Sequence, residues 1–155
     1  MKLWRSWIVS RPPPLATQPS PDPREPGFDK DRALMAVILI VEDDEFIREI
    51  AEMTIHDWGH EILSASDVDE ALVHLRIPQR IDALFTDIYL KTAILGGCDL
   101  AQLAVALRPH LRVLYTTGNF VTDKTRALFV KDGQFLCKPY TALQLQDSVE
   151  HLLAA

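Results

Sequence analysis

Residues 36–45 read AVILIVEDDE, a run of six apolar residues that ends at once in four carboxylates. Short apolar runs that are rich in β-branched residues and bounded by polar ones are typical of strands buried on both faces of a sheet. Similar runs recur downstream and alternate with segments of helical periodicity. The sequence predicts strands over 36–41, 61–64, 81–86, 111–115 and 134–137, and helices over 46–58, 67–76, 98–107, 120–130 and 141–153.

This alternation predicts the fold class. Strands and helices that alternate in units of about 20–25 residues indicate parallel strands joined by right-handed crossovers. We expect an α/β protein of flavodoxin-like (βα)5 type, with a doubly wound five-stranded parallel sheet in the order 2-1-3-4-5. The helix over 46–58 carries one broad apolar stripe, as in a helix that packs on a core, formed by Phe46, Ile47, Ile50, Met53, Thr54 and Trp58.

The first 34 residues differ from the rest of the chain in composition. Seven of the ten prolines lie between Pro12 and Pro26, and proline lacks a backbone donor and fixes φ. We therefore expect residues 1–34 to form a Pro-rich disordered tail and residues 35–155 to form the domain. Met35 directly precedes the first apolar run, so it is an alternative start of translation.

Charge and cysteine content exclude several classes of protein. The whole chain of 155 residues carries a net charge of −6, and residues 35–155 hold 10 basic and 18 acidic side chains. That balance argues against a nucleic-acid-binding domain, which needs a basic face. Two cysteines cannot build a disulfide scaffold and fit a reducing, cytoplasmic compartment. No apolar run is long enough for a membrane span.

Chemically active side chains follow four of the predicted strands. They are Glu42, Asp43 and Asp44 after the first strand, Asp87 after the third, Thr117 after the fourth and Lys138 after the fifth. The carboxyl ends of parallel strands share one edge, where such sheets bind ligands. Carboxylates gathered there repel one another unless a cation joins them, and oxygen ligands suit Mg²⁺. A carboxylate beside Mg²⁺, a lysine and a hydroxyl form a site that accepts phosphoryl groups.

Four segments carry a resemblance to a known family: ILIVEDDEF at 38–46, LFTDIYL at 84–90, VLYTTGN at 113–119 and FLCKPY at 135–140. In this order they resemble the receiver domain of two-component response regulators over residues 36–153. The resemblance implies that Asp87 is the phosphoacceptor. It also implies that Asp43 binds Mg²⁺ directly, that Glu42 binds it through water and that the backbone carbonyl of Tyr89 completes the protein ligands. Asp44 is an extra carboxylate whose other interpretation is a helix cap.

The resemblance assigns the remaining site residues as well. Thr117 matches the switch hydroxyl that bonds the phosphoryl group, with Thr116 as the alternative. Lys138 matches the lysine that pairs with the phosphoryl oxygens, and its bond to Pro139 is expected to be cis. Phe135 lies where the family has its rotating switch aromatic.

The implied function is that of a stand-alone response regulator, since no output domain follows Leu153 in this sequence. Asp87 would take a phosphoryl group from a phosphohistidine of a sensor kinase or phosphotransfer protein, and the product would change contacts with an unknown protein target. Such a switch is not a turnover enzyme. One alternative is a pseudo-receiver that is not phosphorylated. A second is an aspartyl-phosphate phosphatase, although that class normally has a second Asp where Tyr89 stands. A third is a flavin-binding protein, although the acidic pocket would repel the phosphate of the flavin.

Two departures from the family affect the segment after the phosphoacceptor. Lys91 stands where the family usually has proline, and residues 91–96 (KTAILG) are longer and more apolar than usual. We expect an altered loop with intact chemistry. Tyr89 is bulky and lies two residues past Asp87, so we predict that it shields the acyl phosphate and gives a long-lived phosphorylated form.

Overall fold

The computed structural model describes residues 35–91 and 96–155. The expected tail over 1–34 lies outside the described residues. So do residues 92–95, which are most of the segment that differs from the family pattern. Among those described, no helix has the length and apolar character needed to cross a bilayer.

The core of the domain is a parallel sheet of five strands in the order β2-β1-β3-β4-β5. This order confirms the predicted flavodoxin-like fold class. Every residue of the central strands β1 and β3 is buried, which explains why both read as continuous apolar runs. The strands are β1 (Val37–Val41), β2 (Glu61–Ala65), β3 (Ala83–Asp87), β4 (Arg112–Thr117) and β5 (Gln134–Cys137).

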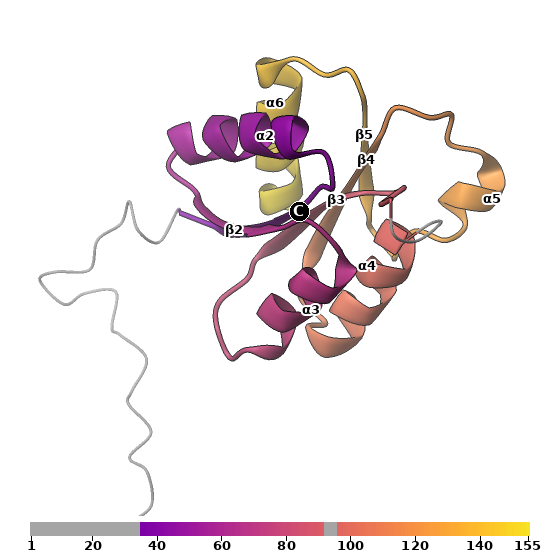
Figure 1. Ribbon diagram of the computed structural model, residues 1–155, viewed down its shortest axis with the longest axis horizontal. Coiled ribbons are helices and arrows are strands. Elements are labelled where there is room, and N and C mark those ends of the chain that lie inside the picture. The colour runs from indigo at the N-terminus through magenta and orange to yellow at the C-terminus, as the bar shows by residue number, and fades with distance from the viewer. Residues whose placement is uncertain (1–34, 92–95) are drawn as a thin grey trace, which may run out of the picture. The chain divides into compact units, whose positions relative to one another are not determined.

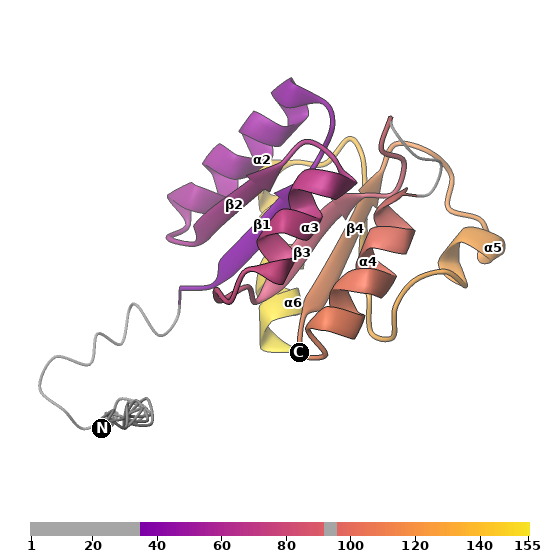
Figure 2. The same cartoon turned by 60° about the horizontal axis from the view of Figure 1, so that its bottom comes forward.

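Helices cover both faces of the sheet. Figures 1 and 2 show α2 and α6 on one face, and α3 and α4 on the other. Side chains alternate along each strand, so Ile38 and Ile40 pack toward α2 and α6 while Leu39 and Val41 join the core under α3 and α4. The helices are α2 (Glu45–Asp57), α3 (Val68–Arg76), α4 (Gly96–Leu107), α5 (Asp123–Arg126) and α6 (Ala142–Ala154).

The helix predicted over 120–130 is much shorter than expected. Thr122 caps α5 by accepting from the Thr125 N–H, and the helix ends at Arg126. Farther on, the backbone N–H of Val130 donates to the Tyr115 hydroxyl at 3.1 Å. Before that contact, the N–H groups of Leu128 and Phe129 bond to the carbonyls of Thr125 and Arg126, three residues back, so the chain leaves α5 in tighter turns and does not continue the α-helix.

The apolar stripe of α2 is only partly buried. The residues of α2 that are fully buried against the sheet are Ala51 and Ile55, and neither belongs to the predicted stripe. The neighbouring row consists of Phe46, Ile50 and Met53, which are 70%, 45% and 67% exposed. The helix therefore packs on the sheet with a face that is rotated from the predicted stripe. We call the row of Phe46, Ile50 and Met53 the exposed row of α2.

Candidate functional site

Three carboxylates converge at the carboxyl edge of the sheet. Strands β1 and β3 are neighbours, with Val41 paired to Thr86, so the residues that end them lie side by side. Glu42, Asp43 and Asp87 each place one oxygen within 4.8 Å of the others. Glu42 and Asp87 are buried, at 1% and 8% exposure. We call these three residues the acidic cluster.

Asp44 does not belong to the acidic cluster. Its side chain accepts from the Ile47 N–H at 3.1 Å and caps the N-terminus of α2. The capping interpretation of this carboxylate is therefore the one that the structure bears out. By opening the helix directly after β1, this cap holds Glu42 and Asp43 at the edge of the sheet.

Lys138 reaches into the acidic cluster from the far strand. Its Nζ donates to Glu42 Oε2 and to Asp87 Oδ2, both at 2.6 Å. Its backbone N–H donates to the Thr117 carbonyl at 2.9 Å, and the Lys138–Pro139 peptide bond is cis, as expected. Its side chain is only 14% exposed, so one buried ammonium bridges two buried carboxylates.

Burial and charge shift the pKa values of this bridge. Burial raises the pKa of Glu42, and the hydrogen bond from Lys138 offsets only part of that rise. Burial on its own would lower the pKa of Lys138, but its hydrogen bonds to Asp87 and Glu42 outweigh it, so the net pKa is raised. The Lys138 ammonium therefore stays charged between the two carboxyl groups.

Both candidate hydroxyls of β4 are buried. Thr117 accepts from the Asn119 N–H at 3.2 Å. Thr116 is the register partner of Asp87, and its Oγ1 has no hydrogen-bond partner among the described residues. As register partner of Asp87, Thr116 faces the same side of the sheet as the Asp87 side chain, whereas Thr117, the next residue, ends β4 at the carboxyl edge. Neither is hydrogen-bonded to Asp87 or Lys138 within the described part of the chain.

Residues after β3 fix the orientation of Asp87. The Tyr89 N–H donates to Asp87 Oδ1 at 2.9 Å, and Lys91 contacts Asp43 from the same segment. Gly97 approaches the strand so closely that a Cβ there would lie 1.9 Å from the Asp87 carbonyl oxygen. The sequence showed a glycine in this loop but gave no sign of that approach, because it depends on how α4 meets β3.

Phe135 belongs to an aromatic column on the α3 and α4 side of the sheet. It is half-buried on β5 and paired in register with Tyr115. Phe129 lies against both: its ring centroid is 4.1 Å from that of Tyr115 in a stacked pair and 6.3 Å from that of Phe135. The side chain of Phe135 is therefore held by a neighbour that sequence reasoning did not single out.

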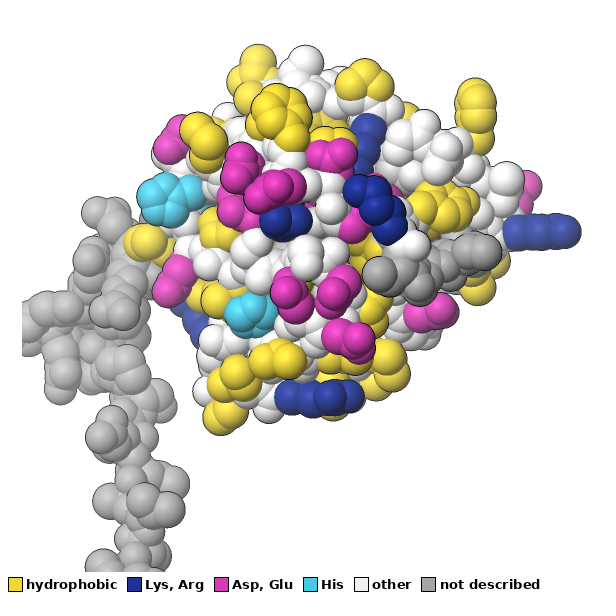
Figure 3. All heavy atoms as spheres, in the orientation of Figure 1, with side chains coloured by type: hydrophobic (Ala, Val, Ile, Leu, Met, Phe, Trp, Pro, Cys, Tyr) yellow, Lys and Arg dark blue, Asp and Glu magenta, His cyan; other side chains and the backbone are white. Residues whose placement is uncertain are grey.

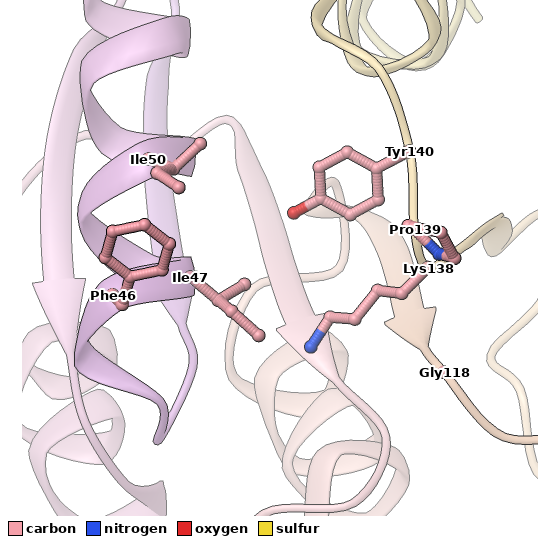
Figure 4. A pocket seen from close by; sticks show the side chains of 7 residues that line it. All are labelled: Phe46, Ile47, Ile50, Gly118, Lys138, Pro139 and Tyr140. Atoms are coloured by element: carbon pink, nitrogen blue, oxygen red, sulfur yellow. The ribbon is translucent and has the colours of Figure 1, made fainter.

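A cavity of about 410 Å³ opens next to Lys138. Figure 4 shows Lys138 and Tyr140 on one side of it and Phe46, Ile47 and Ile50 of α2 on the other. The Tyr140 hydroxyl is buried and has no hydrogen-bond partner among the described residues. The cavity is lined by Phe46, Ile47, Ile50, Gly118, Lys138, Pro139 and Tyr140.

The donor set of the acidic cluster fits a hard divalent cation. All of its side-chain ligands are carboxylate oxygens, which Mg²⁺ prefers, and neither histidine nor cysteine contributes. In Figure 3 acidic side chains gather around basic ones on the face that carries α2 and α3. The fit rests on the three converging oxygens.

Comparisons with known proteins agree with this geometry. The profile of the response regulator receiver domain matches residues 38–150. The crystal structure of a response regulator receiver protein from Sinorhizobium medicae is 27% identical, with a TM-score of 0.72, and the match covers 78% of this chain and 96% of that one. The structure of NtrX from Brucella abortus is 28% identical, with a TM-score of 0.69, over 77% of this chain and 27% of that one.

Curated relatives include longer regulators. The response regulator protein FleR of Pseudomonas aeruginosa is 31% identical over 120 residues, which are 75% of this chain and 24% of FleR. The nitrogen assimilation regulatory protein NtrX of Azorhizobium caulinodans is 29% identical over 118 residues, 75% of this chain and 26% of NtrX. The chain thus spans about a quarter of these relatives. With its profile match, its fold and its acidic cluster, the chain belongs to the response regulator receiver domain family, whose general function is phosphorylation-based signalling.

Proposed function

We propose that this chain is a phosphoacceptor switch in which Asp87 takes a phosphoryl group from a phosphohistidine of a sensor kinase or phosphotransfer protein. The observation that carries this proposal is the bridge at the carboxyl edge. Lys138 Nζ lies 2.6 Å from Asp87 Oδ2 inside a cluster of three carboxylates. A structural ion pair has no need of two further carboxylates, whereas a phosphoryl-accepting site needs them for its metal.

In this mechanism an Asp87 carboxylate oxygen attacks phosphorus. The P–N bond to the donor imidazole breaks, its electron pair stays on the imidazole nitrogen, and Asp87 carries an acyl phosphate. Lys138 pairs with the incoming phosphoryl oxygens, since its ammonium already lies against Asp87. Asp43, Asp87 and the Tyr89 carbonyl, with Glu42 through water, would hold Mg²⁺, which would supply charge neutralisation to the same oxygens when bound.

The cavity beside Lys138 supports a protein phosphodonor. A phosphohistidine must approach along the carboxyl edge, and the protein that carries it needs a surface there. Phe46 and Ile50 present apolar area on one side of the cavity, and on the other lies the buried Tyr140 hydroxyl, which has no partner within the part of the chain that the structure describes. An apolar patch beside a charged reaction centre fits contact with another protein.

The switch would run through β4 and β5. A phosphoryl group on Asp87 adds negative charge toward which the Thr117 hydroxyl can donate its proton, since that hydroxyl only accepts in its bond from the Asn119 N–H. Phe135 would then shift within the aromatic column, which lies next to the short α5. The segment around α5 has only one helical turn, so it can rearrange at low cost and alter contacts with a protein target.

The test is phosphorylation by a small donor. The protein is incubated with acetyl phosphate or phosphoramidate and Mg²⁺, and its intact mass is measured. We expect a gain of one phosphoryl group that Asp87→Asn abolishes and that Asp99→Asn, an exposed carboxylate on α4, leaves unchanged. No gain in the wild type would refute the proposal in favour of a pseudo-receiver. Steady hydrolysis of phosphate esters would refute it in favour of a phosphatase.

A further inference from the structure

Asp43 is paired with a cation that the family pattern does not supply. Lys91 places its backbone N–H 3.1 Å and its Nζ 3.5 Å from the same oxygen, Asp43 Oδ2. We propose that Lys91 is an intramolecular competitor of Mg²⁺ that sets the cation concentration at which the site becomes ready for phosphorylation. This inference rests on the proposed function of the acidic cluster.

The two lysines at the site differ in burial. Lys138 is 14% exposed and bridges two buried carboxylates, so it is a fixed part of the site. The side chain of Lys91 is 73% exposed, whereas that of Asp43 is 14% exposed. The Lys91 ammonium can therefore leave for solvent without losing buried contacts, which is what a displaceable competitor requires.

The competition follows from charge. A divalent cation bound at Asp43 meets the Lys91 ammonium on the same oxygen, and the two positive charges repel. Because Lys91 can move into water, the effect is limited to the size of an exposed ion pair. We expect it to weaken Mg²⁺ binding by roughly two- to fivefold at low salt. Salt screens exposed charges, so the effect should shrink as ionic strength rises.

The residue at position 91 explains why this contact is particular to the chain. The family usually has proline there, and proline offers neither an ammonium nor a backbone N–H. Both contacts to Asp43 Oδ2 therefore depend on this substitution. The altered loop that the sequence predicted therefore changes the Mg²⁺ affinity of the site and removes none of its ligands.

The experiment is a Mg²⁺ titration without any phosphoryl donor, followed by the amide NMR shifts of the acidic cluster. We compare the wild type with Lys91→Met, which keeps the backbone N–H and removes the charge. Lys91→Arg keeps the charge. Lys131→Met is the matched control, because Lys131 is exposed and lines a different cavity beside Arg112, at the opposite end of β4.

We expect Lys91→Met to bind Mg²⁺ roughly two- to fivefold more tightly than the wild type at low salt, with the difference lost at high salt. Lys91→Arg and Lys131→Met should match the wild type. Equal or weaker binding by Lys91→Met would overturn the inference and leave the proposed function standing. We expect an Asp43→Asn variant, which lacks a metal ligand, to show no saturable Mg²⁺ response. If the wild type shows none either, the metal site itself is overturned.

Discussion

Replacement of Lys138 by methionine tests whether the bridge holds the acidic cluster together. The substitution keeps an unbranched side chain, one atom shorter, but removes two hydrogen bonds of 2.6 Å, to Glu42 and to Asp87. Both carboxylates are buried, so they would be left uncompensated beside Asp43. Breaking a buried pair from one side costs about 3–5 kcal/mol, and we expect a loss of that size in the free energy of unfolding, measured without Mg²⁺ at neutral pH.

The pH dependence of this loss follows from the pKa shifts. The pKa of Lys138 is raised above 10.5, so its stabilising contribution is fully present below 10.5 and is lost as the pH rises through the folded-state value. Wild type and variant should therefore converge in strongly alkaline solution. Burial already raises the pKa of Glu42, and the variant also lacks the lowering effect of Lys138. Glu42 then protonates at a higher pH in the variant, so the deficit should also narrow on acidification.

Urea unfolding followed by circular dichroism measures the effect, and a double-mutant cycle identifies its origin. Asp87→Asn in the Lys138→Met background should recover at least about 1 kcal/mol, because it removes one unpaired buried charge. Lys131→Met, at an exposed position, should stay within about 0.5 kcal/mol of the wild type. A loss below about 1 kcal/mol, the level of a surface ion pair, or a loss that does not vary with pH, would refute the reasoning.

Three further outcomes follow from the site. Mg²⁺ at ten times its dissociation constant should stabilise the protein by about 1.4 kcal/mol in thermal unfolding, and Asp43→Asn should remove this gain; an equal gain in the variant would place the ion elsewhere. Gly97→Ala puts a Cβ 1.9 Å from the Asp87 carbonyl oxygen, so we expect it to lower the free energy of unfolding by about 1–3 kcal/mol or more and to slow phosphorylation. A variant as stable as the wild type in urea unfolding would contradict the close approach. Thr117→Val should leave phosphorylation by acetyl phosphate in place but abolish the phosphorylation-dependent shifts of β5 amides; if Thr116→Val does so instead, the alternative hydroxyl is the switch.

The fold and the position of the site could both be predicted from sequence for one physical reason. Parallel strands buried on both faces read as apolar runs, and their carboxyl ends share an edge. A residue that directly follows an apolar run is therefore predicted to lie at that edge of the sheet. Glu42, Asp87 and Lys138 are far apart in the chain, and they meet at distances of 2.6 Å between the ammonium and each carboxylate. Their roles in phosphoryl transfer remain predictions.

The contacts that escaped prediction depend on how loops meet strands. No local pattern states that Gly97 touches the backbone of Asp87, or that Lys91 folds back onto Asp43. The short α5 also escaped prediction, since the residues after it form turn bonds to carbonyls three residues back and then contact the Tyr115 hydroxyl through the Val130 N–H. In each case a tertiary contact overrides a local preference, and a periodic pattern carries no information about that partner.

The exposed row of α2 is a different kind of failure. Periodicity identified an apolar stripe, but the sheet takes the row with the small Ala51, which lets the helix pack closely, and leaves Phe46, Ile50 and Met53 largely in water. Full burial of such a side chain would contribute about 1.5–3 kcal/mol to the free energy of unfolding. Leaving the three side chains exposed forgoes most of that contribution. Phe46 and Ile50 line the cavity beside Lys138. These two exposed apolar residues thus lie next to a lysine of the candidate site, and a sequence is expected to depart from the requirements of its fold at functional positions.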